Sequence, residues 1–500
     1  MTRYLTKTIT VFAFFLIPAL VGGQGIAQDA DTEIHMPSFS ELAEGWNTLK
    51  PGGETSCAHG TEYEFYARAG DPSKLLIYLF GGGICFDAEG CAAGSGHYSE
   101  RIEPRGNQNS FRGFLGIGDP EHPDNPFREH TMVFIPYCTG DVHMGNRDHE
   151  YELQENDGTT RTFTIRHRGQ INGNSALEWI YMNMPGLREI FVSGLSAGGI
   201  ATPFYANRLA RAYPDARVVG LGDGVGAFSS RDDAIRSDPE DNPARWGFPD
   251  AVRKHSGWEE FPAQAGIQDL HILASREMPN LRLYQVDHAN DANQLWWFRQ
   301  LGFPDPNLQD IFRSHRSEIR SEVPAFRVFI LGGHEHGVLT SNEFYRKSVG
   351  NVRLRDWTSA IATGEEVQDV ICEDCLRPGF IYDEDDLAII NAMISRLSPP
   401  DSWNPNDEEG PCPEGAGSWS LRCAVSDVVR EMMDQSPGNF PVALDIINEA
   451  VVRTGYDRGR GSAFPALRLY NNAPGSTHTE IMEFLETVRE RILHQLNSEP

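Results

Sequence analysis

The chain has 500 residues, enough for one large domain with an appendage or for two or three domains, and 40% of them are hydrophobic. Its 71 acidic and 43 basic side chains give a net charge of −28 at pH 7. Such a charge repels nucleic acid and anionic membranes, so neither is expected as a partner. It also disfavours a strongly acidic polymer as substrate, although a role in solubility is the simpler explanation.

The first 27 residues have the pattern of a secretory signal peptide. Arg3 and Lys7 precede an apolar run over residues 9–21, and small residues up to Ala27 suit a cleavage site. Pro18 and the glycines after the run leave it too short for a membrane anchor. We therefore expect cleavage near Ala27 and a soluble protein, secreted or periplasmic, without membrane insertion.

Eight cysteines suit an oxidising compartment, where an even number favours disulfides over metal thiolates. Closeness in sequence predicts Cys85 with Cys91 and Cys412 with Cys423. The Cys372–Cys375 pair lacks the strand-to-helix setting of a redox motif and is interpreted as a third disulfide, which leaves Cys57 with Cys138.

Six apolar runs predict strands buried on both faces of a parallel sheet, and each is followed by turn residues or a polar group. The runs cover residues 74–80, 131–137, 189–194, 217–222, 281–286 and 325–331. Helical patterns lie between several of them, over residues 174–184 and 197–213, the second containing Pro203. The alternation predicts an α/β fold with a doubly wound, mostly parallel sheet, whose ligand crevice lies beyond the carboxyl ends of the strands.

The composition of the sequence changes after Ser398. Residues 399–418 are rich in proline, glycine and acids, and amphipathic helices are expected over residues 424–434, 442–453 and 479–496. We predict a main domain over residues 28–397 and a disulfide-containing helical extension over residues 398–500 that packs against it. The alternative is that the extension is an independent binding module.

Ser196 lies in the sequence Gly-Leu-Ser-Ala-Gly, directly after a predicted strand. This is the pattern of a nucleophile elbow, in which small residues let the backbone turn sharply and expose a serine hydroxyl. With 49 glycines in the chain, the pattern arises easily by chance. Its place at a strand end, beside other polar strand ends, favours the functional interpretation.

Serine hydrolysis also needs a base and a carboxylate that orients it, and in α/β-hydrolases these follow in the order Ser, Asp or Glu, His. Asp223 and Asp287 both follow predicted strands and are both candidates for the acid. His334 and His336 both follow the last predicted strand and are both candidates for the base.

The oxyanion of the tetrahedral intermediate needs backbone donors. Ala197 follows the serine, and Gly81-Gly82-Gly83 forms a loop after an earlier strand, where glycine lets the backbone approach a substrate. A metal site at His334 and His336 is a minor alternative, because a third ligand is missing apart from the distant Asp141 and His143.

Several segments together resemble the pectin acetylesterase/Notum family of carboxylesterases. They are CAHGTEYEFYAR, LLIYLFGGGICFD, YCTGDVHMGN, GLSAGG and VDHANDANQL, while HEHGVL and DWTSAIATGEEVQDVICEDC look closest to the bacterial members. The resemblance runs from about Cys57 to Cys375. It implies an α/β-hydrolase fold and a Ser-Asp-His enzyme that removes acyl groups from hydroxyls without a cofactor.

The resemblance also assigns roles to single residues. Ser196 matches the nucleophile, Asp287 the aspartate of an Asp-x-x-Gln-like segment with extra residues before Gln294, and His336 the base before an aliphatic pair. The implied oxyanion donors are Gly82, Gly83 and Ala197, and Asp223 resembles an aspartate that supports the triad. Leu195 replaces the family's usual cysteine and Gly83-Ile84 its bulky aromatic pair, so the acyl pocket is expected to differ.

The sequence thus predicts a secreted serine carboxylester hydrolase that removes acetyl groups from carbohydrate hydroxyls. The alternatives are a lipase-like or polyester esterase for longer or neutral acyl esters, a metal-dependent hydrolase, and a non-catalytic binding protein on a hydrolase scaffold. No cofactor is expected, the partner is a small-molecule or carbohydrate ester, and the sequence does not reveal the oligomeric state.

Overall fold

The computed structural model describes residues 36–498 except residues 103–114, 230–244, 277, 301–302, 304–305, 409, 413–416, 434–439 and 457–462. Residues Met36–Pro500 make one compact unit. The predicted signal peptide lies outside the described residues. Within the described part of the chain, no helix is both long enough and apolar enough to cross a bilayer.

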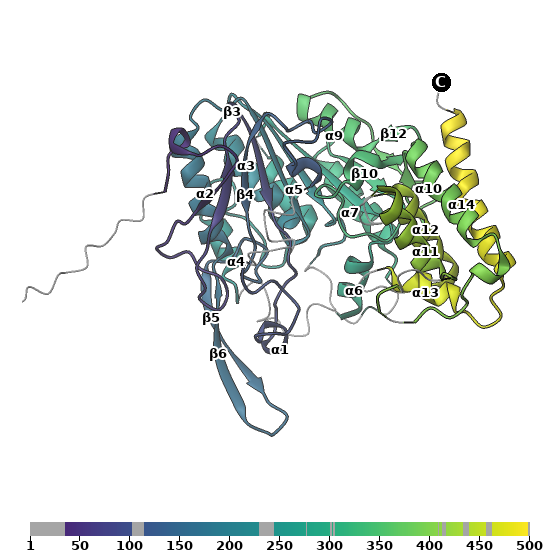
Figure 1. The fold of residues 1–500 in the computed structure, drawn as a ribbon. Helices are drawn as coiled ribbons and strands as arrows, with labels where there is room; N and C mark the ends of the chain where they lie inside the picture. The colour runs from purple at the N-terminus through teal and green to yellow at the C-terminus, as the bar shows by residue number, and fades with distance from the viewer. Residues whose placement is uncertain are drawn as a thin grey trace, which may run out of the picture. The chain divides into compact units, whose positions relative to one another are not determined.

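A nine-stranded sheet, in the order β1-β2-β4-β3-β7-β8-β9-β10-β13, forms the centre of the fold (Figure 1). From β4 to β13 all neighbours are parallel, whereas β1 and β2 pair antiparallel at one edge. The strands are β1 (Trp46–Leu49), β2 (Phe65–Arg68), β3 (Asp71–Leu79), β4 (His130–Ile135), β7 (Glu189–Leu195), β8 (Arg217–Asp223), β9 (Leu281–His288), β10 (Arg327–Leu331) and β13 (Val370–Ile371). The predicted mostly parallel α/β-hydrolase-like sheet is confirmed.

Continuous apolar runs form the inner strands because both faces of the sheet are covered. Every residue of β4 is buried, as are all but the first residues of β7, β8 and β10. The flanking helices include α2 (Gly169–Asn183), α3 (Ala197–Ala212), α5 (Ile267–Ser275), α7 (Leu308–Glu322) and α9 (Leu354–Thr363). Burial on both faces explains why the strands lack the polar alternation of a half-exposed sheet.

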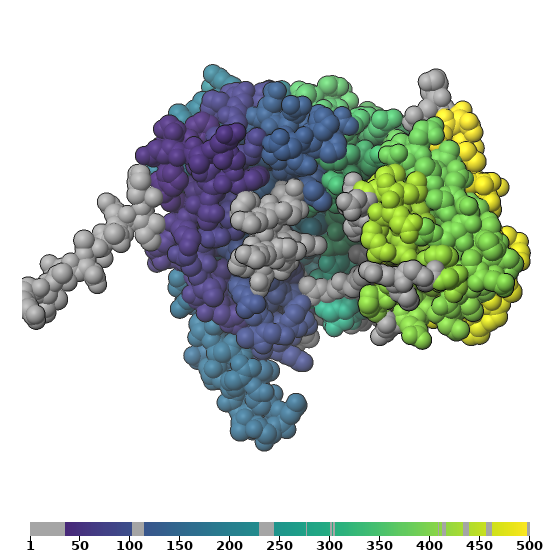
Figure 2. Space-filling model, viewed as in Figure 1, coloured from purple at the N-terminus to yellow at the C-terminus, as the bar shows by residue number. Residues whose placement is uncertain are grey.

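Smaller elements complete this part of the chain. They are η1 (Phe39–Glu41), α1 (Ala88–Cys91), η3 (Gly116–Gly118), α4 (Phe248–Arg253), α6 (Ala292–Gln300), α8 (Glu343–Arg346), and the strands β12 (Val352–Arg353), β11 (Lys347–Val349) and β14 (Gly379–Phe380) of a small sheet. An antiparallel hairpin of β5 (Arg147–Gln154) and β6 (Thr160–His167) extends away from the large sheet (Figure 2).

The C-terminal helices surround a second hydrophobic core. They are α10 (Glu384–Leu397), η5 (Pro400–Ser402), α11 (Leu421–Met433), α12 (Pro441–Thr454), α13 (Pro465–Asn471) and α14 (His478–Ser498). This core starts near Phe380 and includes Ile389, Ile390 and Met393 of α10. Helix α10 therefore packs with the C-terminal helices, whereas the predicted main domain over residues 28–397 includes it. The division at residue 398 itself stays a prediction.

All four predicted disulfides are confirmed: Cys57–Cys138, Cys85–Cys91, Cys372–Cys375 and Cys412–Cys423. The first joins the segment before β2 to the residue three positions after β4. It therefore fixes the start of the loop that contains Asp141 and His143.

Candidate active site

Ser196 forms a sharp turn between β7 and α3. The strand ends at Leu195 and the helix begins at Ala197, so only the serine separates them. Its backbone has φ 53° and ψ −121°, a conformation that is strained for a residue with a side chain. Strain of this kind at a strand-to-helix turn is the defining feature of a nucleophile elbow.

The glycine loop after β3 packs directly against this turn. A Cβ atom on Gly81 would lie 3.1 Å from Ser196 Cβ and 2.7 Å from the carbonyl oxygen of Leu195, which is too close for a side chain. Gly83 has φ +77°, and a Cβ there would lie 2.0 Å from the carbonyl oxygen of His97. Only glycine fits at both positions. The close approach of Gly81 to Ser196 places the loop beside the serine, as an oxyanion loop requires.

A buried histidine is hydrogen-bonded to the residue that precedes this glycine loop. His143 Nε2–H donates to the carbonyl oxygen of Phe80 at 2.8 Å, and burial lowers the pKa of His143 to about 4, so its ring is neutral. Val142 and His143 both have positive φ angles, and the amide of Val142 donates to the hydroxyl oxygen of Tyr137. This second strained turn fixes the residue that precedes Gly81.

His336 is paired with Asp291. Its Nδ1 lies 2.7 Å from Asp291 Oδ2, the geometry of an imidazole N–H that donates to a carboxylate. Asp291 is fully buried; burial raises its pKa, but His336 and Gln294 lower it by more, so the carboxyl is held below its ordinary pKa. A charged acid at Nδ1 leaves Nε2 as the proton-accepting nitrogen of His336.

The sequence predicts Asp287 as the carboxylate partner of His336, but Asp287 is hydrogen-bonded to other residues. Its Oδ1 accepts hydrogen bonds from the amide of Gly226 at 2.8 Å and from Gln294 Nε2 at 3.1 Å. Burial raises the pKa of Asp287 to about 7. Strand β9 continues through His288, so Asp287 lies inside the strand, and the following turn carries Asp291 to the histidine instead.

The predicted site does not include Asp291, although the sequence contains a spacing that points to it. The family pattern Asp-x-x-Gln needs two residues between the aspartate and the glutamine, and Asp291-Ala-Asn-Gln294 has this spacing. The extra residues between Asp287 and Gln294 indicated that Asp287 was out of register.

Asp223 connects the serine turn to the histidine loop. Its carbonyl oxygen accepts the amide of Ser196 at 2.9 Å, while its Oδ2 accepts the amides of Val338 and Leu339 at 2.8 and 2.9 Å. The ring of His336 lies against Gly224, where a Cβ would be 3.2 Å from Nδ1. Ser196 and His336 thus flank the same short segment, and Asp223 joins this segment to the residues that follow His336. Its supporting role stays a prediction.

His334 lies in the same loop, two residues before His336. Its carbonyl oxygen accepts the amide of Ala292 at 3.1 Å. Its side chain lines a cavity of about 260 Å³ together with residues of α6 and of the end of α12, among them Leu295, Val451 and Tyr456. Sequence alone left His334 and His336 as alternatives for the base, and the carboxylate contact favours His336.

The groups suggested as distant metal ligands have other contacts. Asp141 accepts Thr139 Oγ1–H at 2.6 Å and the amide of Gly169 at 2.7 Å, and burial raises its pKa to about 6. His143 Nε2 is hydrogen-bonded to Phe80. Neither side chain is arranged with His334 or His336 as a ligand set among the described residues.

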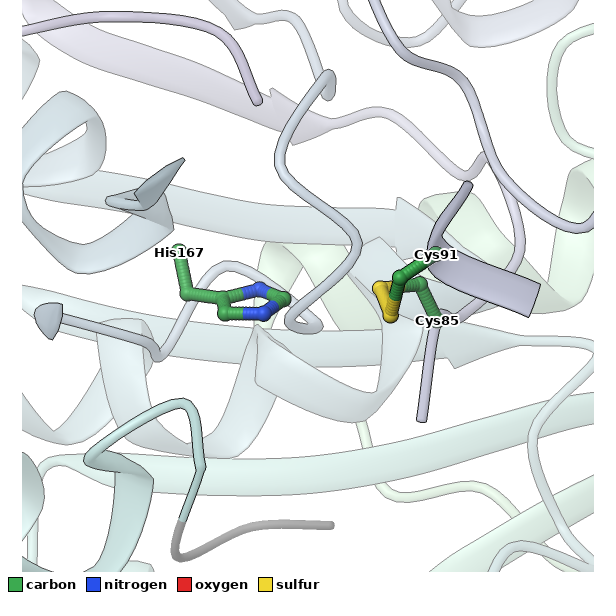
Figure 3. A group of neighbouring side chains, drawn as sticks. All are labelled: Cys85, Cys91 and His167. Carbon is green, nitrogen blue, oxygen red and sulfur yellow. A yellow bond between two sulfur atoms is a disulfide. The ribbon is translucent and has the colours of Figure 1, made fainter. Parts of the chain in front are cut away.

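The one group of described residues with metal-ligand spacing is Cys85, Cys91 and His167 (Figure 3). The two cysteines form a disulfide, which removes their thiolates as ligands. His167 Nδ1 lies 3.0 Å from the carbonyl oxygen of Thr139, and its Nε2 lies 2.9 Å from the hydroxyl of Tyr151. Both ring nitrogens therefore have protein partners, and the group is a packed structural cluster.

Aromatic side chains connect the glycine loop to helix α6. Phe86 packs against Trp297 with ring centroids 5.8 Å apart, and His97 lies edge-on to Trp296 and Trp297 at 5.9 Å from each. These four side chains are all half-buried. The carbonyl oxygen of His97 accepts the amide of Ile84 at 3.3 Å, and α6 begins directly after Asp291, so the cluster joins the segment of the glycine loop to the segment of Asp291.

Comparison with known families agrees with this geometry. Residues 50–264 match the model of the pectinacetylesterase family. The predicted resemblance is confirmed. The matched range of the pectinacetylesterase model contains the glycine loop, Ser196 and Asp223, and it ends before Asp291 and His336.

Individual relatives are distant. The chain is 27% identical to palmitoleoyl-protein carboxylesterase notum2 of Xenopus laevis, over 31% of this chain and 30% of the relative. It is 28% identical to NOTUM of Mus musculus, over 37% of this chain and 36% of that protein. It is also 28% identical to inactive palmitoleoyl-protein carboxylesterase notum1b of Danio rerio, over 23% of this chain and 76% of the relative.

The match spans about a third of the length of the first two of these relatives. Together, the pectinacetylesterase match and these relatives support an esterase or hydrolase function.

Proposed function

We propose that the chain is a secreted serine carboxylester hydrolase that removes acetyl groups from carbohydrate hydroxyls, with Ser196, His336 and Asp291 as its catalytic triad. The observation that carries the proposal is the hydrogen bond between His336 and Asp291 beside the strained turn of Ser196. The acetyl group is chosen because residues 50–264 match a pectinacetylesterase model. The four disulfides fit an oxidising compartment.

In the proposed acylation step, Ser196 Oγ attacks the ester carbonyl carbon while His336 Nε2 takes its proton. The amides of Gly82, Gly83 and Ala197 stabilise the oxyanion. His336 then gives the proton to the departing alcohol oxygen as the C–O bond breaks, and Asp291 stabilises the imidazolium between these transfers. A water molecule attacks the acyl-enzyme by the same route, releases the acid and restores Ser196.

The test is hydrolysis of p-nitrophenyl acetate by the wild type and by Ser196→Ala. The variant is expected to lose almost all activity and to stop reacting with a fluorophosphonate probe, because both need the serine hydroxyl. Equal rates for the two proteins would refute the serine mechanism. The rate of the wild type is expected to be unchanged in chelator, and a loss that added metal restores would favour the metal-dependent alternative.

A second candidate is an esterase for longer acyl chains, favoured by the relatives named palmitoleoyl-protein carboxylesterases. Rates on acetyl, butyryl and octanoyl esters, beside acetate release from acetylated pectin and acetylated xylan, distinguish the two. A marked preference for octanoyl esters would contradict the deacetylase assignment. Because one relative is named inactive, a non-catalytic binding protein is a further candidate. Failure of the folded protein to react with the fluorophosphonate probe would support this candidate.

A further inference from the structure

The C-terminal helices contact the loops that hold His336 and Asp291, which places them beside the proposed chemistry. Helices α10 to α14 lie together at the C-terminal end of the chain (Figure 1). They form their own hydrophobic core and lie beyond the range of the matched family model. Two side chains of α12, Asn448 and Glu449, nevertheless reach the main sheet's strand-end loops.

Asn448 binds the residue next to the proposed base. Its Nδ2–H donates to Glu335 Oε1 at 2.7 Å and to the carbonyl oxygen of Leu444 at 2.9 Å, and only 4% of Asn448 is exposed. Glu335 directly precedes His336 in the loop after β10. A helix of the C-terminal core therefore holds the loop of His336 through a partly buried side-chain hydrogen bond.

Glu335 is an ionised anchor for this contact. Burial raises its pKa, but Lys347 and His288 lower it by more, so the pKa of Glu335 is held well below its usual range. Lys347 is fully buried, with its Nζ 3.6 Å from Glu335 Oε1 and 3.0 Å from Glu343 Oε2. A hydrogen bond from Asn448 to a buried carboxylate is charge-assisted and costly to remove.

Glu449 binds a segment that contacts both loops. Its Oε2 accepts Arg377 Nε–H at 2.9 Å. Two residues earlier, the carbonyl oxygen of Cys375 accepts the amide of Gly333 at 3.1 Å and the side-chain amide of Asn290 at 2.6 Å. Gly333 leads into the His336 loop and Asn290 directly precedes Asp291, so this segment fixes the acid and the base together.

We propose that the C-terminal helical segment is part of the catalytic apparatus, with Asn448 as a positioning residue that holds the His336 loop through Glu335. The proposal rests on the esterase function proposed above. Small displacements of a catalytic group reduce rates strongly, so a partly buried hydrogen bond one residue from the base is well placed to affect the chemistry.

The experiment compares Asn448→Leu and Asn448→Asp with Asn471→Leu. The leucine removes the donor at similar volume, and the aspartate presents an acceptor to the Glu335 carboxylate. Asn471 is the matched control, because it is buried in the same core and bonds Trp403, Leu421 and Asn404 without reaching the catalytic loops. Melting temperatures of all three variants show how much each change destabilises the protein.

Two readouts separate positioning from general destabilisation. Hydrogen–deuterium exchange of the amides over residues 333–339 is expected to accelerate in the Asn448 variants and to stay unchanged in Asn471→Leu. The kcat on ethyl acetate is expected to fall about tenfold in the Asn448 variants, with KM changed less than about twofold. The kcat on p-nitrophenyl acetate should fall less, because its good leaving group needs no proton from His336.

Unchanged exchange in the Asn448 variants, or equal effects in Asn471→Leu at a similar melting temperature, would overturn the proposal. The exchange result decides this point even if the protein hydrolyses no ester. Failure of the esterase function itself has a different signature, namely equal rates for the wild type and Ser196→Ala.

Discussion

Asp287 and Asp291 share one amide: Gln294 Nε2–H lies 3.1 Å from Asp287 Oδ1 and 3.0 Å from Asp291 Oδ2. Their pKa values nevertheless shift in opposite directions, to about 7 for Asp287 and below the ordinary value for Asp291. The difference arises because Asp291 has the imidazole of His336 beside it and Asp287 does not. Separation of this kind supports the charged, orienting role that we propose for Asp291.

Replacement of Asp291 should therefore reduce activity far more than replacement of Asp287. Asp291→Asn removes the charge that stabilises the imidazolium and leaves His336 in the wrong tautomer, so kcat is expected to fall by about 10³- to 10⁴-fold. Asp287→Asn keeps an acceptor for Gly226 and should cost less than about tenfold. Steady-state kinetics on p-nitrophenyl acetate checks this, and the reverse order would restore Asp287 as the triad acid.

Asp287 is expected to affect the pH dependence of stability. Its folded-state pKa of about 7 lies above the ordinary value of 3.8, so the folded protein binds the proton more tightly than the unfolded chain. This contribution is fully present below about pH 4 and is lost as the pH rises through 7, with a slope of at most about 1.4 kcal/mol per pH unit.

Asp287→Asn removes this titration, so its free energy of unfolding should fall less between pH 5 and 7 than that of the wild type. Urea unfolding at pH 5, 6, 7 and 8 measures the difference. A difference between the two proteins that does not change over this range would contradict the buried, protonated state of Asp287.

Asp223 should be needed for the position of the His336 loop. Asp223→Ala leaves the buried amides of Val338 and Leu339 without their acceptor, which costs about 1–3 kcal/mol for each amide. Asp223→Asn retains one side-chain oxygen and should be milder in both stability and kcat. Denaturant unfolding and kinetics on the two variants test this, and equal losses would show that the charge matters rather than the hydrogen bonds.

The aromatic cluster should contribute to binding of large substrates. Trp297→Ala removes a ring that packs against Phe86 and His97, in the cluster that joins the glycine loop to α6. We expect KM for acetylated xylan to rise several-fold, since aromatic rings supply much of the contact area in ligand sites, with little change in kcat on p-nitrophenyl acetate. Trp357→Ala is the control for loss of a large side chain, because the ring of Trp357 packs on Phe329 and is not part of the cluster. A parallel loss on both substrates would mean that Trp297 is needed for folding only.

The inner sheet was predictable because its strands are continuous apolar runs. The β5–β6 hairpin was not predicted, since few of its side chains are buried and its charged residues hide the strand pattern. The Asp157-Gly158 pair between the two strands is a hairpin signal that had been available.

The site was only partly predictable for a different reason. Ser196 and the glycine loop carry local sequence signals that follow from backbone geometry. The choice between Asp287 and Asp291 depends on where β9 ends, and strand ends are poorly determined by sequence patterns. The contacts of Asn448 and Glu449 join segments more than 70 residues apart, so no local pattern could reveal them.

The close packing of Gly81 on Ser196 limits how the proposed esterase can be re-engineered. A Cβ at position 81 would clash with the carbonyl oxygen of Leu195 and crowd Ser196 Cβ, so substitution there is expected to disturb the serine turn instead of changing substrate preference. Leu195 directly precedes Ser196, and Ile84 directly follows the glycine loop. Mutant libraries that aim at a new acyl preference should therefore randomise positions 84 and 195 and leave position 81 untouched.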